Sequence, residues 1–166
     1  MKHILLLFLA AIISMNAAAQ NADSLETKIE HVDSLNAKIE KLQHDLDYLS
    51  CNYELNKIIT DLSIGEDEVS SNSNAIRMDC YHSRFDRRLY DAYKEYLYSK
   101  MGWYDAIKDK IESTITFVAL KMISSDFSEK EKDCIERSIN VIDKAKYSFE
   151  QALDYYETVL DIYRGL

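Results

Sequence analysis

Residues that break helices are almost missing from this chain. Its 166 residues include no proline and only three glycines, Gly65, Gly102 and Gly165. Because proline and glycine disfavour a helix interior most strongly, their scarcity favours long helices. It also leaves little material for glycine-rich phosphate loops or nucleophile elbows, and zinc-finger spacing is missing too. We therefore expect an all-α, non-enzymatic protein that needs no cofactor and no metal.

Basic residues are also in short supply. Twenty Lys and Arg stand against 29 Asp and Glu, which gives a formal net charge of −9. Such a surface repels phosphate backbones and anionic headgroups, so it argues against nucleic-acid binding and against adsorption to acidic lipids. The remaining explanations are solubility or a cationic partner. We expect the partner to be another protein or a second copy of this chain, with a small-molecule ligand less favoured.

The longest apolar run is too short to span a bilayer. It covers Ile4–Ile13, after a basic start at Met1–His3 and before the small residues Ala17–Ala19. This arrangement is typical of a cleaved secretory signal, so we expect residues 1–19 to be removed. The mature chain would then enter the periplasm of a bacterium or leave the cell. No stable membrane insertion is expected afterwards.

A ten-residue duplication follows the signal: Asp23–Val32 is repeated, imperfectly, as Asp33–Leu42. Apolar residues recur there at steps of three and four, with one missing beat between Val32 and Leu35, which predicts a coiled-coil helix over 20–62. This seam is a candidate for self-association into a dimer or trimer. Its residues are Leu25, Ile29, Val32, Leu35, Ile39, Leu42, Leu46, Leu49 and Tyr53.

Residues 63–73 interrupt the apolar pattern with Gly65 and a run of Ser and Asn, which predicts a flexible loop. A hairpin at this loop would bring Cys51 and Cys80 to one height on neighbouring helices. We therefore hypothesise a Cys51–Cys80 disulfide. The alternative is that these two residues and Cys134 remain thiols.

Two further helices are predicted in residues 74–166. The first covers about 74–124 and has a candidate kink at Gly102, and the second begins with a capping box at Ser128 and Glu131. Short turns make neighbouring helices antiparallel. The expected architecture is one domain of three long antiparallel helices, forming an elongated bundle or coiled coil.

Aromatic and arginine residues gather at the start of the second predicted helix. Tyr, Trp and Arg are favoured at binding hot spots, so this face is a candidate surface for a protein partner or a ligand. The alternative is that the rings fill the space between helices. The candidate residues are Tyr81, Arg84, Phe85, Arg88, Tyr96, Tyr98 and Trp103.

These features favour an exported protein that acts through protein–protein contacts, as an envelope scaffold, adaptor or accessory subunit. One alternative is a module that binds a glycan or small amphiphile on the Tyr/Trp face. Another is a periplasmic chaperone that holds unfolded, basic clients. An aromatic cavity would favour the ligand module, whereas a packed aromatic seam would favour the scaffold.

Overall fold

The computed structural model describes the backbone of residues 2–82 and 85–164, with side chains from residue 27 onward. Within these ranges the chain forms three helices, α1 (Lys2–Tyr81), α2 (Arg87–Ser124) and α3 (Glu129–Ile162), which confirms the all-α bundle. The side chains of the predicted signal, residues 1–19, and of Leu25 lie outside this description. The chain divides into two compact units, Met1–Asp45 and Leu46–Leu166.

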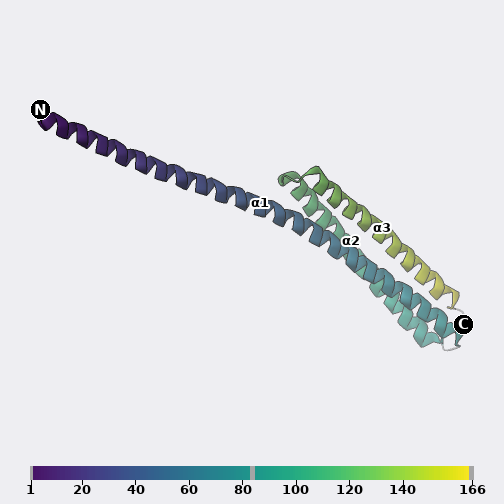
Figure 1. The fold of residues 1–166 in the computed structure, drawn as a ribbon. Coiled ribbons are helices and arrows are strands. Elements are labelled where there is room, and N and C mark those ends of the chain that lie inside the picture. Colours follow the sequence, from purple (N-terminus) through teal and green to yellow (C-terminus); the bar gives the residue numbers. More distant parts are fainter. Residues whose placement is uncertain (1, 83–84, 165–166) are drawn as a thin grey trace. The chain divides into compact units, whose positions relative to one another are not determined.

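The second unit is the three-helix bundle (Figure 1). Its helices alternate in direction, because contacts between α1 and α2 pair rising residue numbers with falling ones. Lys121 reaches Asp47 at 2.7 Å, Lys110 reaches Asp61 at 2.9 Å, and Lys100 pairs with Glu68. Helix α3 returns parallel to α1, with Phe127 beside Tyr48 at one end and Tyr155 beside Arg77 at the other.

A single apolar core runs along the bundle, and each helix supplies one stripe at steps of three and four. On α3 this stripe matches the predicted heptad rhythm, including Ile135, Ile142 and Phe149. The contribution of α1 begins at Cys51. The buried apolar residues of α1 are Cys51, Leu55, Ile58, Leu62, Val69 and Ile76, and those of α2 are Leu97, Tyr104, Ile107, Ile111 and Val118.

The predicted loop at residues 63–73 is wrong, because this segment lies inside α1. The apolar stripe of α1 continues through the segment, but two of its buried positions carry the small residues Gly65 and Ser73. At Gly65 the backbone lies against the rings of Trp103 and Phe149. The Ser73 hydroxyl donates to the Val69 carbonyl oxygen at 2.9 Å, so it is satisfied within the helix. Small residues that allow close helix packing were therefore mistaken for a turn.

Helix α1 instead continues to Tyr81, and α2 begins at Arg87. Asp86 caps α2, because its carboxylate accepts hydrogen bonds from the amides of Arg88 at 2.9 Å and Leu89 at 3.0 Å. Helix α2 continues without a break through the candidate kink at Gly102. The capping box that begins α3, between Ser128 and Glu131, is confirmed.

The turn position decides how well the helices match. Helices α2 and α3 contain 38 and 34 residues, which corresponds to about 57 and 51 Å at 1.5 Å per residue. The part of α1 from Asp47 to Tyr81 is of similar length. A turn at Gly65 would have given three helices of unequal length. In the described bundle, the three packed helix stretches are similar in length.

Candidate interaction surface

The predicted self-association seam is exposed along its whole described length. Its members from Ile29 to Tyr53 have exposed fractions between 43% and 67%. In the first unit these residues are Ile29, Val32, Leu35, Ile39 and Leu42; in the second they are Leu46, Leu49 and Tyr53. Large apolar side chains in a heptad row normally meet another helix, so this row is an unpartnered helix face.

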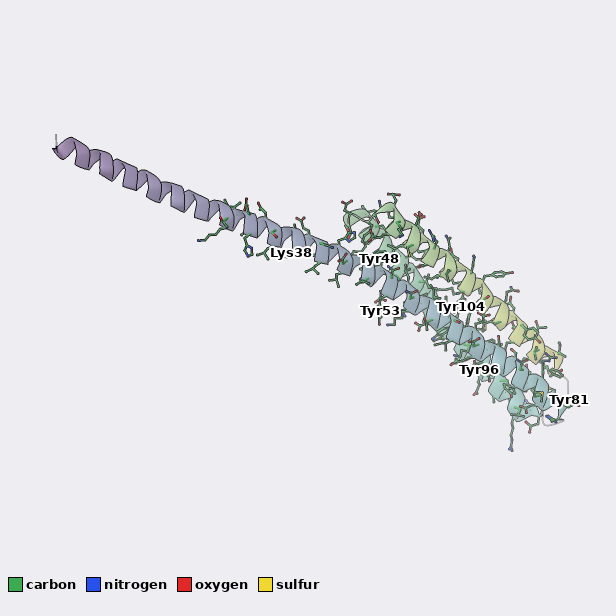
Figure 2. The ribbon with its side chains drawn as sticks, in the orientation of Figure 1. Lys38, Tyr48, Tyr53, Tyr81, Tyr96 and Tyr104 are labelled. Carbon is green, nitrogen blue, oxygen red and sulfur yellow. The ribbon has the colours of Figure 1, made fainter. Side chains whose placement is uncertain are left out.

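In the bundle, the seam and the core stripe occupy different faces of α1. At 100° per residue, Tyr53 lies about 200° around the helix from Cys51, so the two side chains face roughly opposite ways. Cys51 is fully buried, whereas Tyr53 is 64% exposed. Figure 2 labels Tyr48 and Tyr53 on α1. Tyr48, which lies between the two faces, packs edge-on against Phe127, with ring centroids 5.9 Å apart. The seam is therefore available while the bundle is fully packed.

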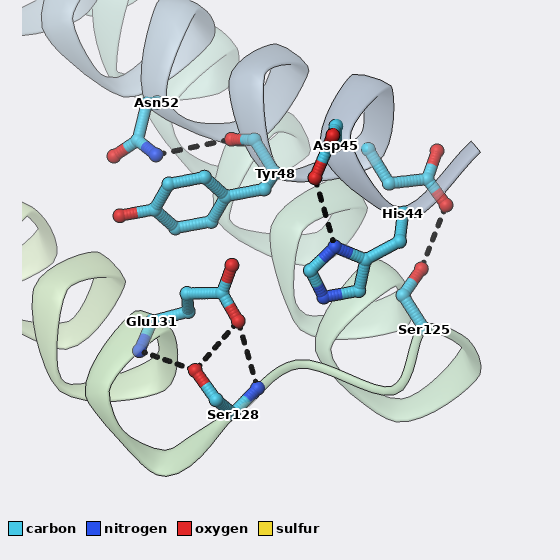
Figure 3. A network of polar contacts seen from close by, with 8 residues as sticks. His44, Asp45, Tyr48, Asn52, Ser125, Ser128 and Glu131 are labelled. Carbon is cyan, nitrogen blue, oxygen red and sulfur yellow. Dashed lines mark hydrogen bonds and ion pairs between the residues drawn. The ribbon is translucent and has the colours of Figure 1, made fainter. Parts of the chain in front are cut away.

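A polar network fixes the end of the bundle where the exposed seam overlaps it (Figure 3). The Asp47 carboxylate accepts hydrogen bonds from the Ser125 hydroxyl and the Lys121 ammonium group, both at 2.7 Å. At the N-terminus of α3, the Glu131 carboxylate accepts a hydrogen bond from the Ser128 amide at 2.8 Å and so completes the capping box. A hydrogen bond to Cys134, together with burial, raises the pKa of Tyr48. The contacts of Asp47 and Tyr48 lie on the side of α1 that faces α2 and α3. The seam residues Leu46, Leu49 and Tyr53 remain exposed.

Two charged residues flank the seam and were not singled out by the sequence prediction. Lys38 and Asp45 each precede a seam residue, Ile39 and Leu46 respectively, and both are exposed. The His44 Nδ1 atom lies 3.4 Å from the Asp45 carboxylate, which nevertheless remains 53% exposed. The sequence did contain a signal for them, because Lys38 and Asp45 are one heptad apart. Charged residues next to a coiled-coil seam help to determine which helix it pairs with.

The predicted aromatic face is divided between the core and the surface. Trp103 packs against Phe149 with ring centroids 5.4 Å apart, and Tyr96 packs against Tyr156 at 5.6 Å. Phe85 stacks on Tyr93 at 6.3 Å. These rings fill the space between α2 and α3, as the alternative interpretation expected.

The remaining members of that face do not form one surface. Tyr81 and Tyr98 are 81% and 60% exposed, and Arg88 is also exposed. Tyr98 carries the Lys94 ammonium group 5.6 Å from its ring centroid. Arg84 lies outside the described residues. Phe85 also lines a solvent-open depression of about 440 Å³, together with Tyr90 and Tyr163.

Tyrosine hydroxyls join the helices at positions that the sequence prediction did not assign. Tyr93 donates to the Asp79 carboxylate at 2.7 Å, and Tyr104 donates to Glu150 at 2.6 Å. Burial is the main reason why the pKa of Tyr93 rises to about 12, and the hydrogen bond to Asp79 adds to it. Burial and Glu150 likewise raise the pKa of Tyr104. The Tyr93 and Tyr104 hydroxyls therefore keep their protons, and each donates a hydrogen bond to a carboxylate of a neighbouring helix.

The hypothesised Cys51–Cys80 disulfide is wrong. Both residues lie on α1, 29 positions apart, which separates them by about 44 Å along a helix. Disulfides require Cα atoms within about 7 Å. Cys51 is a buried thiol, Cys80 is half-buried, and Cys134 is an exposed thiol.

Within the part of the chain with described side chains, no three or more His, Cys, Asp or Glu residues gather as metal ligands. Over the same residues, no helix is long and apolar enough to cross a membrane. A depression of about 560 Å³, lined by Arg77, Met78 and Tyr81 among others, is open to solvent. The comparisons return nothing: no known protein family, curated protein or solved structure matches this chain.

Proposed function

We propose that this chain is an exported, non-enzymatic helical-bundle protein that acts through protein–protein contacts, as an envelope scaffold, adaptor or accessory subunit. The observation that carries the proposal is the exposed seam from Ile29 to Tyr53. The bundle has its own core and does not need this row. A contiguous apolar row on a folded chain marks an interaction site.

The chemistry of the seam favours another helix as the partner. Its residues recur at steps of three and four, and each Leu or Ile that becomes buried contributes about 1.5–3 kcal/mol. A second copy of this chain offers the same pattern, so self-association is the contact we infer. The scaffold would act by joining two bundles.

Export is supported by the sequence of residues 1–19. If these residues are removed, Lys2 is lost and the formal net charge changes from −9 to −10. The periplasm or the cell exterior is the destination that such a signal would give.

The test is the solution mass of residues 20–166, the form that signal cleavage would leave, measured by light scattering over a range of concentrations. We expect a dimer. Leu42→Asp should weaken it by about a hundredfold or more, because a carboxylate would be buried in the seam. The matched control is Leu120→Asp on α2, because Leu120 is 62% exposed and Leu42 is 67% exposed.

The control should leave the mass unchanged. A wild-type chain that stays monomeric at high concentration would refute self-association. Equal weakening by both substitutions would mean that the contact is not in the seam.

A further inference from the structure

The residues on the two sides of the seam differ in charge. In the heptad register of the seam, Ile39 and Leu46 are at position a, and Leu35, Leu42 and Leu49 are at position d. The residues before position a, at position g, are Lys38 and Asp45, which carry opposite charges and are exposed. The residues after position d, at position e, are all neutral: Asn36, Gln43 and Ser50. Only one side of the seam can therefore form ion pairs.

This asymmetry distinguishes the two directions in which a second copy can pack. In a parallel pair, each g position faces an e position of the other helix. When the two parallel copies are in register, Lys38 would then face Gln43 and Asp45 would face Ser50, and both of these residues are neutral. In an antiparallel pair, reversal of one helix brings g positions face to face. Lys38 and Asp45 can then meet residues of opposite charge.

The charges also select one antiparallel register. When Ile39 lies opposite Leu42 of the second copy, Lys38 lies opposite Asp45 of the second copy, and two-fold symmetry repeats the pair. A shift of one heptad in one direction places Lys38 opposite its own counterpart, and a shift in the other direction does the same for Asp45. Both shifts create a repulsive pair.

We propose that two copies of this chain pair through the seam as an antiparallel, two-fold symmetric coiled coil, with Ile39 opposite Leu42 and two Lys38–Asp45 ion pairs between the copies. This inference rests on the proposed self-association and adds its direction and register.

The experiment is a charge-reversal cycle on residues 20–166, with the dimer dissociation constant measured by sedimentation equilibrium at low salt. Lys38→Asp alone and Asp45→Lys alone each replace two attractive pairs by two repulsive ones. We expect each to weaken the dimer by about 5–30-fold. The double variant restores both pairs with the charges exchanged, so its dissociation constant should return to within about threefold of the wild type.

Matched controls carry the same charge changes away from the seam. Lys41→Asp and Glu40→Lys are at exposed positions, c and b of the same heptad respectively, and should change the dissociation constant by less than about twofold. High salt should reduce the effect of the single seam variants, because exposed ion pairs are screened.

A second measurement reports direction without relying on affinity. In a Cys134→Ser background, Tyr53→Cys places a thiol in the seam. In a parallel pair it would lie beside its counterpart and cross-link on mild oxidation. In the proposed register the two thiols are about 37 Å apart along the axis, so we expect no cross-link.

The outcomes separate the two proposals. A wild-type dimer in which Lys38→Asp acts no more strongly than Lys41→Asp, or in which the Tyr53→Cys thiols cross-link, would overturn the antiparallel register and leave the proposed function standing. A stable trimer would do the same. A chain that remains monomeric would overturn both.

Discussion

At the scale of single residues, the two helical glycines of the described bundle have opposite roles. A Cβ atom at Gly65 would lie 2.8 Å from both the Trp103 and the Phe149 ring, and these rings are packed on each other. Gly65→Ala should therefore lower the free energy of unfolding by about 1–3 kcal/mol, through overpacking. At Gly102 a Cβ atom would meet nothing within 4 Å. Gly102→Ala should raise it by about 0.5–1 kcal/mol.

Urea denaturation followed by circular dichroism measures both values. Because the two substitutions are chemically identical, any general effect of the extra methyl group cancels in the comparison. A stabilising Gly65→Ala would contradict the close approach of α1 to the two rings.

The buried tyrosine hydroxyls make a prediction about alkaline pH. The pKa of Tyr93 is raised by burial, and further by Asp79, from 10.0 to about 12. Between these pH values the unfolded chain loses the proton while the folded chain keeps it, so the free energy of unfolding must fall as the pH rises. This contribution is fully present below pH 10. Tyr93→Phe cannot ionise and should show a shallower fall in urea denaturation between pH 9 and 12.

Tyr98→Phe is the control, because it removes the hydroxyl of an exposed tyrosine instead of a buried one. Tyr93→Phe also removes the hydrogen bond to Asp79, which should cost about 1 kcal/mol at pH 7. An unchanged slope in Tyr93→Phe would show that this hydroxyl does not contribute to the alkaline transition.

At the scale of elements, the stretch from Gly65 to Ser73 behaves as helix because its inner face is buried. Val69 is fully buried, whereas its neighbour Ser70 is exposed. Val69→Ala should lower the free energy of unfolding by about 1–3 kcal/mol, because it removes buried methyl groups. Ser70→Ala should change it by less than about 0.5 kcal/mol. A neutral Val69→Ala would favour the loop that the sequence had predicted.

The same helix carries two apolar rows with different roles. The row from Cys51 to Ile76 is used inside the bundle, and the row from Ile29 to Tyr53 is exposed. They overlap between Cys51 and Tyr53, where one helix presents apolar side chains on roughly opposite faces. A helix that is apolar on both sides is expected to lie between two partners. This overlap is the structural reason for proposing a second copy as the missing neighbour.

At the scale of the whole molecule, three helix stretches of similar length enclose one core. Lysines at 100, 110 and 121 of α2 pair with acidic residues of α1 along its length, which fixes the register of the two helices. The pairs formed by Lys110 and Lys121 are partly buried. The main stabilising contribution to the bundle is the burial of its apolar stripes. The acidic charge of the chain keeps the remaining surface in water.

The sequence by itself determined the helical class, the heptad seam and the start of α3, because these depend on local properties. The scarcity of Pro and Gly, the steps of three and four, and the Ser128–Glu131 capping box act over a few residues. The positions of the aromatic rings were less certain from the sequence, since a ring at the shoulder of a helix can face solvent or a neighbour. The two candidate surfaces were therefore only partly predictable.

Only the tertiary structure decided where α1 ends and which thiols can meet. Gly65 and Ser73 look like turn residues in the sequence, but the bulk of Trp103 and Phe149 on the neighbouring helices makes a small residue the better choice at Gly65. Helix α1 is continuous through Gly65 and ends at Tyr81, so Cys51 and Cys80 lie far apart on one helix. Packing between distant segments outweighs local propensity here, because the space at a buried position is set by residues that are remote in the sequence.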